Sequence, residues 1–329
     1  MSASARVRWA TLLAALVAAV TLGLAFGPVP IAPLDVWRAL AGVGDAAVVG
    51  IVRDLRLPRV ALGLVVGAGL AASGTALQAT LRNPLAEPYL LGVSGGAAVG
   101  AVLAVTLGFA APGLVPLSAF AGATGAVMLV LLVARAAGGR ADPRLLLMAG
   151  VVVGAFCTAA IMVALATAPE GAVRGALWWM MGSLGDAQWS GVRWVAAYVL
   201  VGVALLALWG RDLDVLALGE EAAASLGLDV ERATRRIYLT ASLLAAATVA
   251  GAGLIGFVGL VVPAIARALG GRGARETVLA SALAGGTLVV VADLAARTAL
   301  RPAELPLGAV TALVGVPFFL WRLKDGATR

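Results

Sequence analysis

Ten long runs of apolar residues are the feature that most constrains how this chain can fold. A run of about 20 apolar residues is long enough for a helix to cross the roughly 30 Å hydrocarbon core of a bilayer. We therefore expect an all-α polytopic membrane protein with about ten transmembrane helices. The eighth run is short and contains Pro263, which predicts a tilted or broken helix. The expected spans are 8–27, 57–79, 90–109, 114–134, 145–168, 191–210, 236–254, 256–270, 277–297 and 306–323.

The composition excludes soluble alternatives. Hydrophobic residues make up 62% of the chain and charged residues only 12%, against about 25% charged residues in soluble domains. A soluble globule of this size would have to expose large apolar patches. The net charge of +7 does not indicate a nucleic-acid partner, because the basic residues lie in short loops between apolar runs.

The basic residues also predict the orientation in the membrane. The first apolar run is longer than the core of a signal peptide, which has about 7–15 residues, so we expect it to be retained. With the N-terminus inside, sixteen of the 24 lysines and arginines lie on the inner side and eight on the outer side. This bias predicts cytoplasmic N- and C-termini. It does not explain the outer group, which is Arg38, Arg53, Arg56, Arg59, Arg174, Arg193, Arg297 and Arg301.

Three segments between the spans are long enough to fold outside the membrane. Residues 28–56 are expected outside as a loop with a short helix that begins near Pro33. Residues 169–190 are also expected outside, with three tryptophans in an aromatic belt at the interface. Residues 211–235 form the longest inner loop and are expected to contain short helices.

The residue types argue against chemistry within this chain. There is no histidine, there is one cysteine, and no G-x-x-x-x-G-K-[ST] loop is present, so we expect no catalytic residue, metal site or cofactor. ATP-Mg would have to bind a separate ATPase chain. Two alternatives stay open: an ion-coupled secondary transporter of a small solute, which works without an ATPase, and a membrane-embedded enzyme, whose catalytic side chains are not evident.

Polar and small residues within the spans have two readings. Ser73 and Gln78 in the second run either line a pathway or bond to neighbouring helices. Asp293 and Arg297 are spaced i, i+4 and are expected to pair. Small residues at spacing four, as in Gly63-Gly67-Ala71, favour close packing of helix backbones.

Five motifs in order along the chain resemble one family. They are RLPRVALGLVVGAGLAASGTALQATLRNPLAEPYLLGVSGGAAVGA at 56–101, WMMGSL at 179–184, LGEEAAASLGL at 218–228, GLIGFVGLVVP at 253–263 and PAELPLGAVTALVGVPFF at 302–319. Together they resemble the FecCD-type permeases, the membrane subunits of ABC importers for iron–siderophores, haem and vitamin B12. The resemblance implies a single permease domain over 1–329, with ten transmembrane helices, working by alternating access in the bacterial cytoplasmic (inner) membrane.

The resemblance also implies partners. These are a second copy of the chain, two ATP-binding ABC subunits, a periplasmic or lipid-anchored substrate-binding protein, and membrane lipid, with no nucleic acid. The implied cargo is an iron chelate, cobalamin or haem. The family often has histidine where this chain has Ala264, which weakens the case for a histidine-ligated cargo.

The resemblance assigns roles to two groups of residues, and a third group is our own interpretation. In the family, the inner loop between spans six and seven docks into the ATPase, and arginines at the outer face pair with acidic residues of the binding protein. Pathway lining is our interpretation for two polar residues of the second span. The matching positions are Leu218, Gly219, Glu220, Glu221, Ser225, Leu226 and Gly227 for coupling, Arg56, Arg59 and Arg297 for docking, and Ser73 and Gln78 for the pathway.

Overall fold

The structure is a computed structural model that describes residues 3–109, 111, 113–138, 142–270, 273–300 and 302–327. These residues are almost entirely helical, and their β geometry is limited to an isolated bridge between Leu300 and Ala303. The expected all-α class is therefore confirmed. Arg301, counted above in the outer group, lies outside the described residues.

Each of the ten expected runs coincides with a helix, although the boundaries shift by a few residues. These helices are α1 (Ala3–Ala25), α4 (Leu57–Thr80), α5 (Val93–Thr106), α6 (Leu114–Ala136), α7 (Pro143–Ala166), α9 (Trp189–Leu208), α12 (Val230–Ala252), α13 (Val258–Ala268), α14 (Ala274–Thr298) and α15 (Leu307–Ala327).

Shorter helices occupy the three segments that were expected outside the membrane. The first segment contains α2 (Pro33–Leu40), α3 (Ala46–Gly50) and a π-helical stretch, η1 (Ile51–Arg56). The second contains α8 (Glu170–Met180), and the inner loop contains α10 (Gly210–Ala217) and α11 (Glu220–Ser225). The short helices predicted near Pro33 and within 211–235 are therefore confirmed.

Among the described residues, six helical segments are long and apolar enough to cross a membrane: Ala5–Ala25, Ala46–Thr80, Leu114–Ala136, Arg144–Ala166, Trp189–Leu208 and Ala274–Thr298. The chain is thus a multi-pass membrane protein. The apolar parts of α5, α13 and α15 are shorter than these six segments, so the count of ten spans stays a prediction.

The second span begins further out than its apolar run suggested. α3, η1 and α4 form one continuous helical segment, Ala46–Thr80, which Asp45 caps by accepting a hydrogen bond from the Ala47 amide. The π turn sits directly before Pro58, which has no amide hydrogen to lose. The 28–56 segment is therefore helical over its last third.

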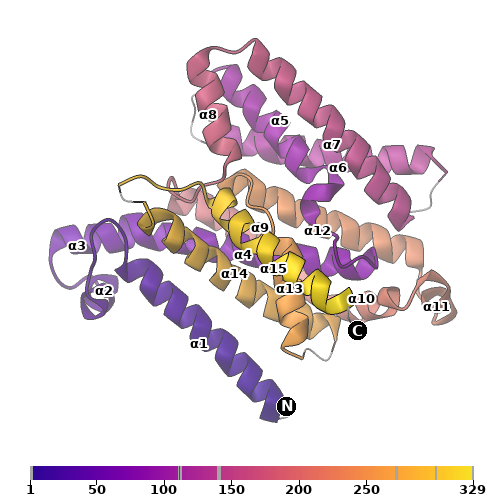
Figure 1. Ribbon diagram of the computed structural model, residues 1–329, viewed down its shortest axis with the longest axis horizontal. Helices are drawn as coiled ribbons and strands as arrows, with labels where there is room; N and C mark the ends of the chain where they lie inside the picture. Colours follow the sequence, from indigo (N-terminus) through magenta and orange to yellow (C-terminus); the bar gives the residue numbers. More distant parts are fainter. Residues whose placement is uncertain are drawn as a thin grey trace.

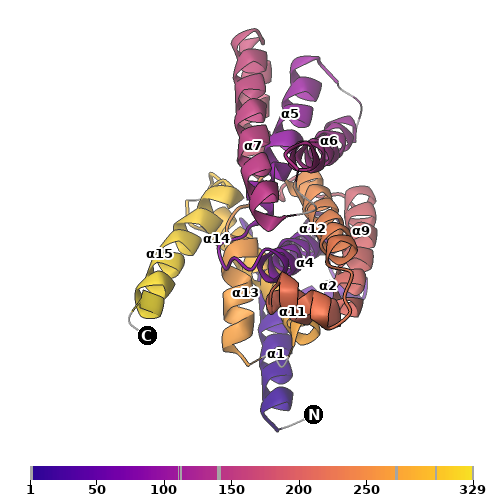
Figure 2. The same ribbon diagram turned by 90° about the vertical axis from the view of Figure 1, so that its right-hand side faces the viewer.

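The helices are arranged around α4, as Figure 1 shows. Helices α5–α8 gather on one side of α4, whereas α1 and α14 lie on the other. The view in Figure 2 shows α7 standing clear of the main body beside α5 and α6. α1 begins and α15 ends on the side of α10 and α11, opposite α2 and α3. We call the α2–α3 side the outer end and the α10–α11 side the inner end.

Small residues hold α4 against its neighbours. A Cβ atom added to Gly67 would lie 2.1 Å from the carbonyl oxygen of Gly285 on α14, and one added to Gly74 would lie 2.0 Å from that of Gly259 on α13. Backbones this close leave no room for a side chain. The packing role predicted for the small-residue row of α4 is therefore confirmed, and α4 is fixed as the buried centre of the bundle.

Candidate functional site

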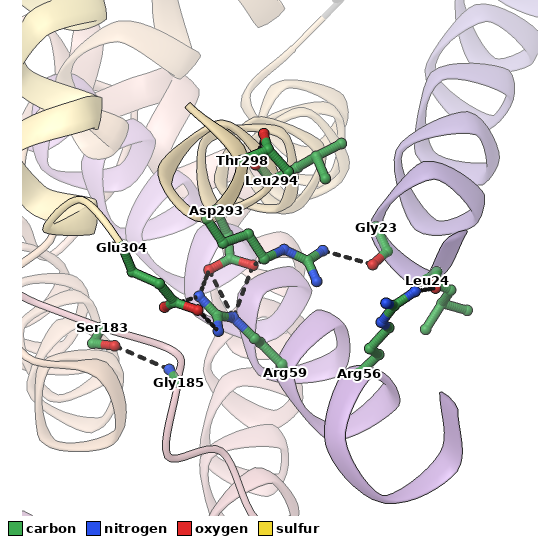
Figure 3. A network of polar contacts seen from close by, with 11 residues as sticks. Gly23, Leu24, Arg56, Arg59, Ser183, Gly185, Asp293, Leu294, Thr298 and Glu304 are labelled. Carbon is green, nitrogen blue, oxygen red and sulfur yellow. Dashed lines mark hydrogen bonds and ion pairs between the residues drawn. The ribbon is translucent and has the colours of Figure 1, made fainter. Parts of the chain in front are cut away.

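An ion-pair network at the outer end joins α4 to α14 and to the loop before α15. The Arg59 guanidinium, in the first turn of α4, donates to Asp293 through Nε and Nη2 at 2.9–3.1 Å. It also donates to both Glu304 carboxylate oxygens, at 3.0 and 2.8 Å (Figure 3). Two carboxylates therefore share one arginine fork, a geometry that a lysine could not reproduce.

Arg297 lies one helical turn after Asp293 and is 3% exposed. Its Nε lies 3.3 Å from Asp293 Oδ2, so the predicted i, i+4 pair is confirmed. Its Nη2 donates to the carbonyl oxygen of Gly23 on α1 at 2.6 Å. The side chain thus joins α14 to α1.

Arg56, at the end of η1, is 5% exposed. Its guanidinium donates to the carbonyl of Leu24 at 2.7 Å (Figure 3). It also donates to the carbonyl of Ala25 at 2.9 Å and to that of Val29. The last carbonyls of a helix have no partners within it. Arg56 supplies these partners where α1 ends.

The docking role stays a prediction for the three arginines, and burial separates two of them from the third. Arg56 and Arg297 donate hydrogen bonds to backbone carbonyls of α1, and their side chains present almost no surface to a partner. Two arginines of the outer group therefore hold helices together. Arg59, by contrast, keeps 13% of its side chain exposed.

Glu304 is the exposed member of the network, with 43% of its side chain accessible. The hydrogen bond from Arg59 lowers the pKa of this carboxyl below its ordinary value of 4.5. The carboxylate therefore stays ionised and paired at neutral pH. Any acidic group from a partner would have to compete with Glu304 for Arg59.

The inner end has the opposite character. Gly219 joins α10 to α11 with a φ of 114°, a conformation open to glycine and strained for other residues. The two leucines that flank α11, Leu218 and Leu226, are 66% and 64% exposed. The coupling role of this loop stays a prediction.

A polar groove of about 790 Å³ runs beside α11, and Arg82, Arg144, Glu220 and Glu221 are among its lining residues. Arg82, with a φ of 49°, lies 3.6 Å from Glu220 and so links the loop after α4 to α11. Gly227 ends the loop with a φ of 82°. Ser225 donates its hydroxyl to the Ala222 carbonyl within α11, so its side chain shapes the helix end.

The two pathway candidates on α4 differ. Ser73 is fully buried and donates to the carbonyl of Ala241 on α12 at 2.7 Å. Ser73 therefore joins two helices, and its pathway role stays a prediction. Gln78 instead borders a cavity of about 400 Å³ near the inner end. Its side-chain oxygen accepts a hydrogen bond from Arg267 at 2.7 Å. Its side-chain nitrogen donates to two carbonyls of α13 at 3.3 Å.

Sequence reasoning missed a polar contact inside the bundle. α5 has 14 residues and α13 has 11, or about 21 and 16 Å, too short for the hydrocarbon core. The segments before them meet, and the one before α5 contains a short 3-10 helix, η2 (Pro88–Leu91). Glu87 accepts a hydrogen bond from the Phe257 amide, and the Tyr89 hydroxyl accepts one from the Ile255 amide, both at 2.8 Å. These bonds satisfy backbone groups that lipid could not.

Phe257 adopts a φ of 66°, rare for a bulky residue. Its side chain borders α15, because a Cβ atom added to Gly315 would lie 2.5 Å from Phe257 Cβ. The Glu87 contact therefore holds a strained turn beside α15. One signal in the sequence could have indicated it: Glu87 is the one acidic residue of the 80–100 segment and is flanked by Pro84 and Pro88.

Nothing in the described part of the chain resembles a metal centre, since no three His, Cys, Asp or Glu side chains gather there. A bundle of apolar helices with an exposed loop at one end and a network of buried ion pairs at the other defines a polytopic membrane protein.

Comparison with known proteins makes the class specific. The FecCD transport family model matches residues 15–325. The chain is 44% identical over 289 residues to the cobalamin import system permease protein of Halobacterium salinarum, covering 88% of this chain and 77% of the relative. It is 41% identical over 273 residues to the hemin transport system permease protein of Yersinia pestis, covering 82% and 81%.

Two further comparisons cover nearly the whole length. The Fe(3+)-citrate import system permease protein of Bacillus subtilis is 37% identical over 325 residues, 97% of this chain and 96% of the relative. A solved inward-facing structure of a metal-chelate type ABC transporter superposes with a TM-score of 0.86 at 27% identity, covering 98% and 99%. The chain belongs to the FecCD transport family, as its motifs predicted.

Proposed function

We propose that this chain is the membrane-spanning subunit of an ATP-driven importer that depends on a substrate-binding protein. Its cargo is an iron chelate, cobalamin or haem, carried across the bacterial inner membrane by alternating access. Family membership supports the transport role, and the names of the relatives supply the range of cargo. The chain itself is not an enzyme in this proposal, because ATP-Mg binds the partner ATPase.

The observation that carries the proposal is the exposed inner loop. Leu218 and Leu226 present apolar surface at both ends of α11, and the polar groove beside them accepts a neighbouring protein surface. Leu218, Gly219, Glu220, Glu221, Ser225, Leu226 and Gly227 together form the coupling loop. Two leucines exposed to water cost free energy that docking on an ATPase subunit recovers.

Arg82 gives the coupling loop a route into the bundle. It contacts Glu220 of α11, and the same inter-helix segment carries Glu87, which holds the turn at Phe257. A movement of α11 would therefore displace Arg82 and the segment that carries Glu87, and with them the Phe257 turn that borders α15. In this proposal two copies of the chain and two ATPase subunits form the complex, and the binding protein docks at the outer end near Arg59 and Glu304.

Copurification with the partner ATPase tests the proposal. Leu218→Asp with Leu226→Asp should reduce recovery of the ATPase by more than about ten-fold, because a charge replaces each apolar contact. Leu269→Asp is the matched control: this leucine is 41% exposed at the end of α13, outside the coupling loop. Equal recovery from both variants would reject the coupling assignment, and a chain that transports without any ATPase would reject the importer class.

A further inference from the structure

An apolar groove lies between α9 and α12, away from the coupling loop and the outer network. It has a volume of about 330 Å³ and almost no polar surface. The residues of α9 that line it are Ala197, Tyr198, Val201, Gly202 and Leu205, and those of α12 are Thr240, Leu243 and Leu244. None of the interactions described above uses this groove.

The groove has a defined end toward the middle of the membrane. Tyr198 packs edge-on against Phe120 of α6 and Trp194 of α9, with ring centroids 5.3 and 5.9 Å away. This aromatic cluster lies at the Tyr198 end of the groove. The groove-lining residues of α9 end at Leu205. From Tyr198 to Trp209, one turn beyond Leu205, the chain advances eleven residues, or about 16 Å along a helix. That is half of the roughly 30 Å hydrocarbon core, the depth of one leaflet.

A tryptophan and an arginine lie beyond the other end of the groove. Trp209 follows the last turn of α9, and the Arg236 guanidinium lies 4.8 Å from its ring centroid. Arg236 is one turn before Thr240 on α12, and Arg232 is one turn earlier on the same face. Tryptophan and arginine at the end of an apolar surface are typical of a membrane–water interface.

Three arginines lie close in sequence to this end of the groove: Arg211 two residues after Trp209, and Arg232 and Arg236 on the turns of α12 before Thr240. Arg211 is exposed, and Arg232 has 75% of its side chain accessible. Asp212 and Asp229 offset part of this charge through their pairs with Arg236 and Arg232. The other nearby acids point elsewhere: Asp214 accepts from the Ala274 amide, and Glu231 lies on the opposite face of α12 from Thr240.

We propose that this groove binds one anionic phospholipid of the inner leaflet. One acyl chain lies between α9 and α12 and ends at the Tyr198 cluster. The phosphodiester lies at Trp209, where Arg211, Arg232 and Arg236 contact it. The groove and the turn that leads from it to Trp209 together have the depth of one leaflet. The groove is apolar along its length, and arginines follow it at the end that the charge bias places in the cytoplasm; together these features select a lipid with a negative headgroup.

Native mass spectrometry of the purified full-length chain tests this site. The chain is mixed with phosphatidylglycerol or phosphatidylcholine of identical acyl chains, and bound lipid is counted for each. The wild type should retain one phosphatidylglycerol per chain in preference to phosphatidylcholine. Arg211→Gln with Arg232→Gln should weaken phosphatidylglycerol retention by about ten-fold, since each basic residue near the surface contributes several-fold.

Two matched controls keep the test specific. Arg6→Gln with Arg135→Gln removes two exposed inner arginines elsewhere and should leave retention unchanged. Thr240→Phe fills the groove and should abolish retention of either lipid, whereas Leu200→Phe, on the part of α9 outside the groove, should not. Equal retention of the two lipids by the wild type, or no difference between variants and controls, would overturn the site. These readings need no ATPase, so they are independent of the importer function.

Discussion

The two ends of this permease carry similar charged residues but use them in opposite ways. At the outer end, Arg56 and Arg297 are 5% and 3% exposed and give their donors to the backbone of α1. At the inner end, Arg82 and Glu220 stay about half exposed, and their ion pair is longer, with 3.6 Å between Arg82 Nη2 and Glu220 Oε1. A charge pattern alone cannot separate an arginine that holds helices together from one that meets a partner. Burial separates them.

The largest effect is expected from Gly219→Pro at the inner end. Proline requires a φ near −65°, whereas Gly219 has a φ of 114°. The turn before α11 would have to change, so the assembled complex should lose the stimulation of ATP hydrolysis by the binding protein. Gly171→Pro is the control, because it lies in the first turn of α8, where proline is tolerated. Normal stimulation in Gly219→Pro would remove the coupling role from this loop.

Arg297→Met should cause the largest loss of stability at the outer end. It leaves the Gly23 carbonyl without its donor and takes one cation from buried Asp293. Breaking a buried pair costs about 3–5 kcal/mol, and the retained Arg59 bond places this variant near the lower value. Unfolding in mixed micelles measures it. Arg38→Met removes the exposed ion pair with Asp35 at 3.4 Å and should cost less than about 1 kcal/mol. Similar losses of stability in the two variants would contradict a structural role for the buried arginine.

A smaller loss is expected inside the bundle from Glu87→Ala. The Phe257 amide would lose its acceptor, at a cost of about 1–3 kcal/mol for an unsatisfied buried donor. Glu87→Gln keeps a carbonyl oxygen in the same place and should recover most of that loss. Unfolding of the two variants under the same conditions compares them directly. If they are equally destabilised, the hydrogen bond to Phe257 does not hold the turn.

The sequence predicted the fold well because membrane spans obey a simple rule. Apolar runs of sufficient length must become helices, and all ten runs coincide with one. The small-residue row of α4 and the Asp293–Arg297 pair were also readable, since both follow from helical spacing. What escaped prediction depends on contacts between distant segments: Glu87 with Phe257, and Arg56 with the end of α1. Neither pair shares a periodic pattern.

The exposure of a site residue could be predicted in a loop but not within a span. Exposure of Leu218 and Leu226 agrees with a loop expected to meet another protein, because a loop between spans is at the surface by construction. Ser73, by contrast, lies on a span where each face has a different neighbour. Its 0% exposure follows from the packing of α12 on α4, which no single-helix pattern can reveal.

Docking at the outer end should change modestly when Glu304 is neutralised. Glu304→Gln releases Arg59 from one of its two carboxylates, so an acidic partner no longer competes with it. The association rate of the binding protein should rise by up to about five-fold at low salt, within the range of exposed ion pairs. Stopped-flow association measures the change, with Asp35→Gln, an exposed outer acid on α2, as control. A rate that falls instead would mean that Glu304 itself is the docking group.

The smallest effect concerns pH at the same carboxylate. Arg59 lowers the pKa of Glu304 below its ordinary value of 4.5, so the unfolded chain binds a proton here at a higher pH than the folded chain does. The pair therefore contributes its full stabilisation above the ordinary value, and this contribution is lost as the pH falls through the lowered pKa. Glu304→Gln removes the titrating group. Its thermal midpoint should be below that of the wild type at pH 7, and the gap should close on acidification below about pH 4.5. A gap that stays constant down to pH 3 would show that Glu304 stabilises the loop by packing and that Arg59 is held by Asp293 alone.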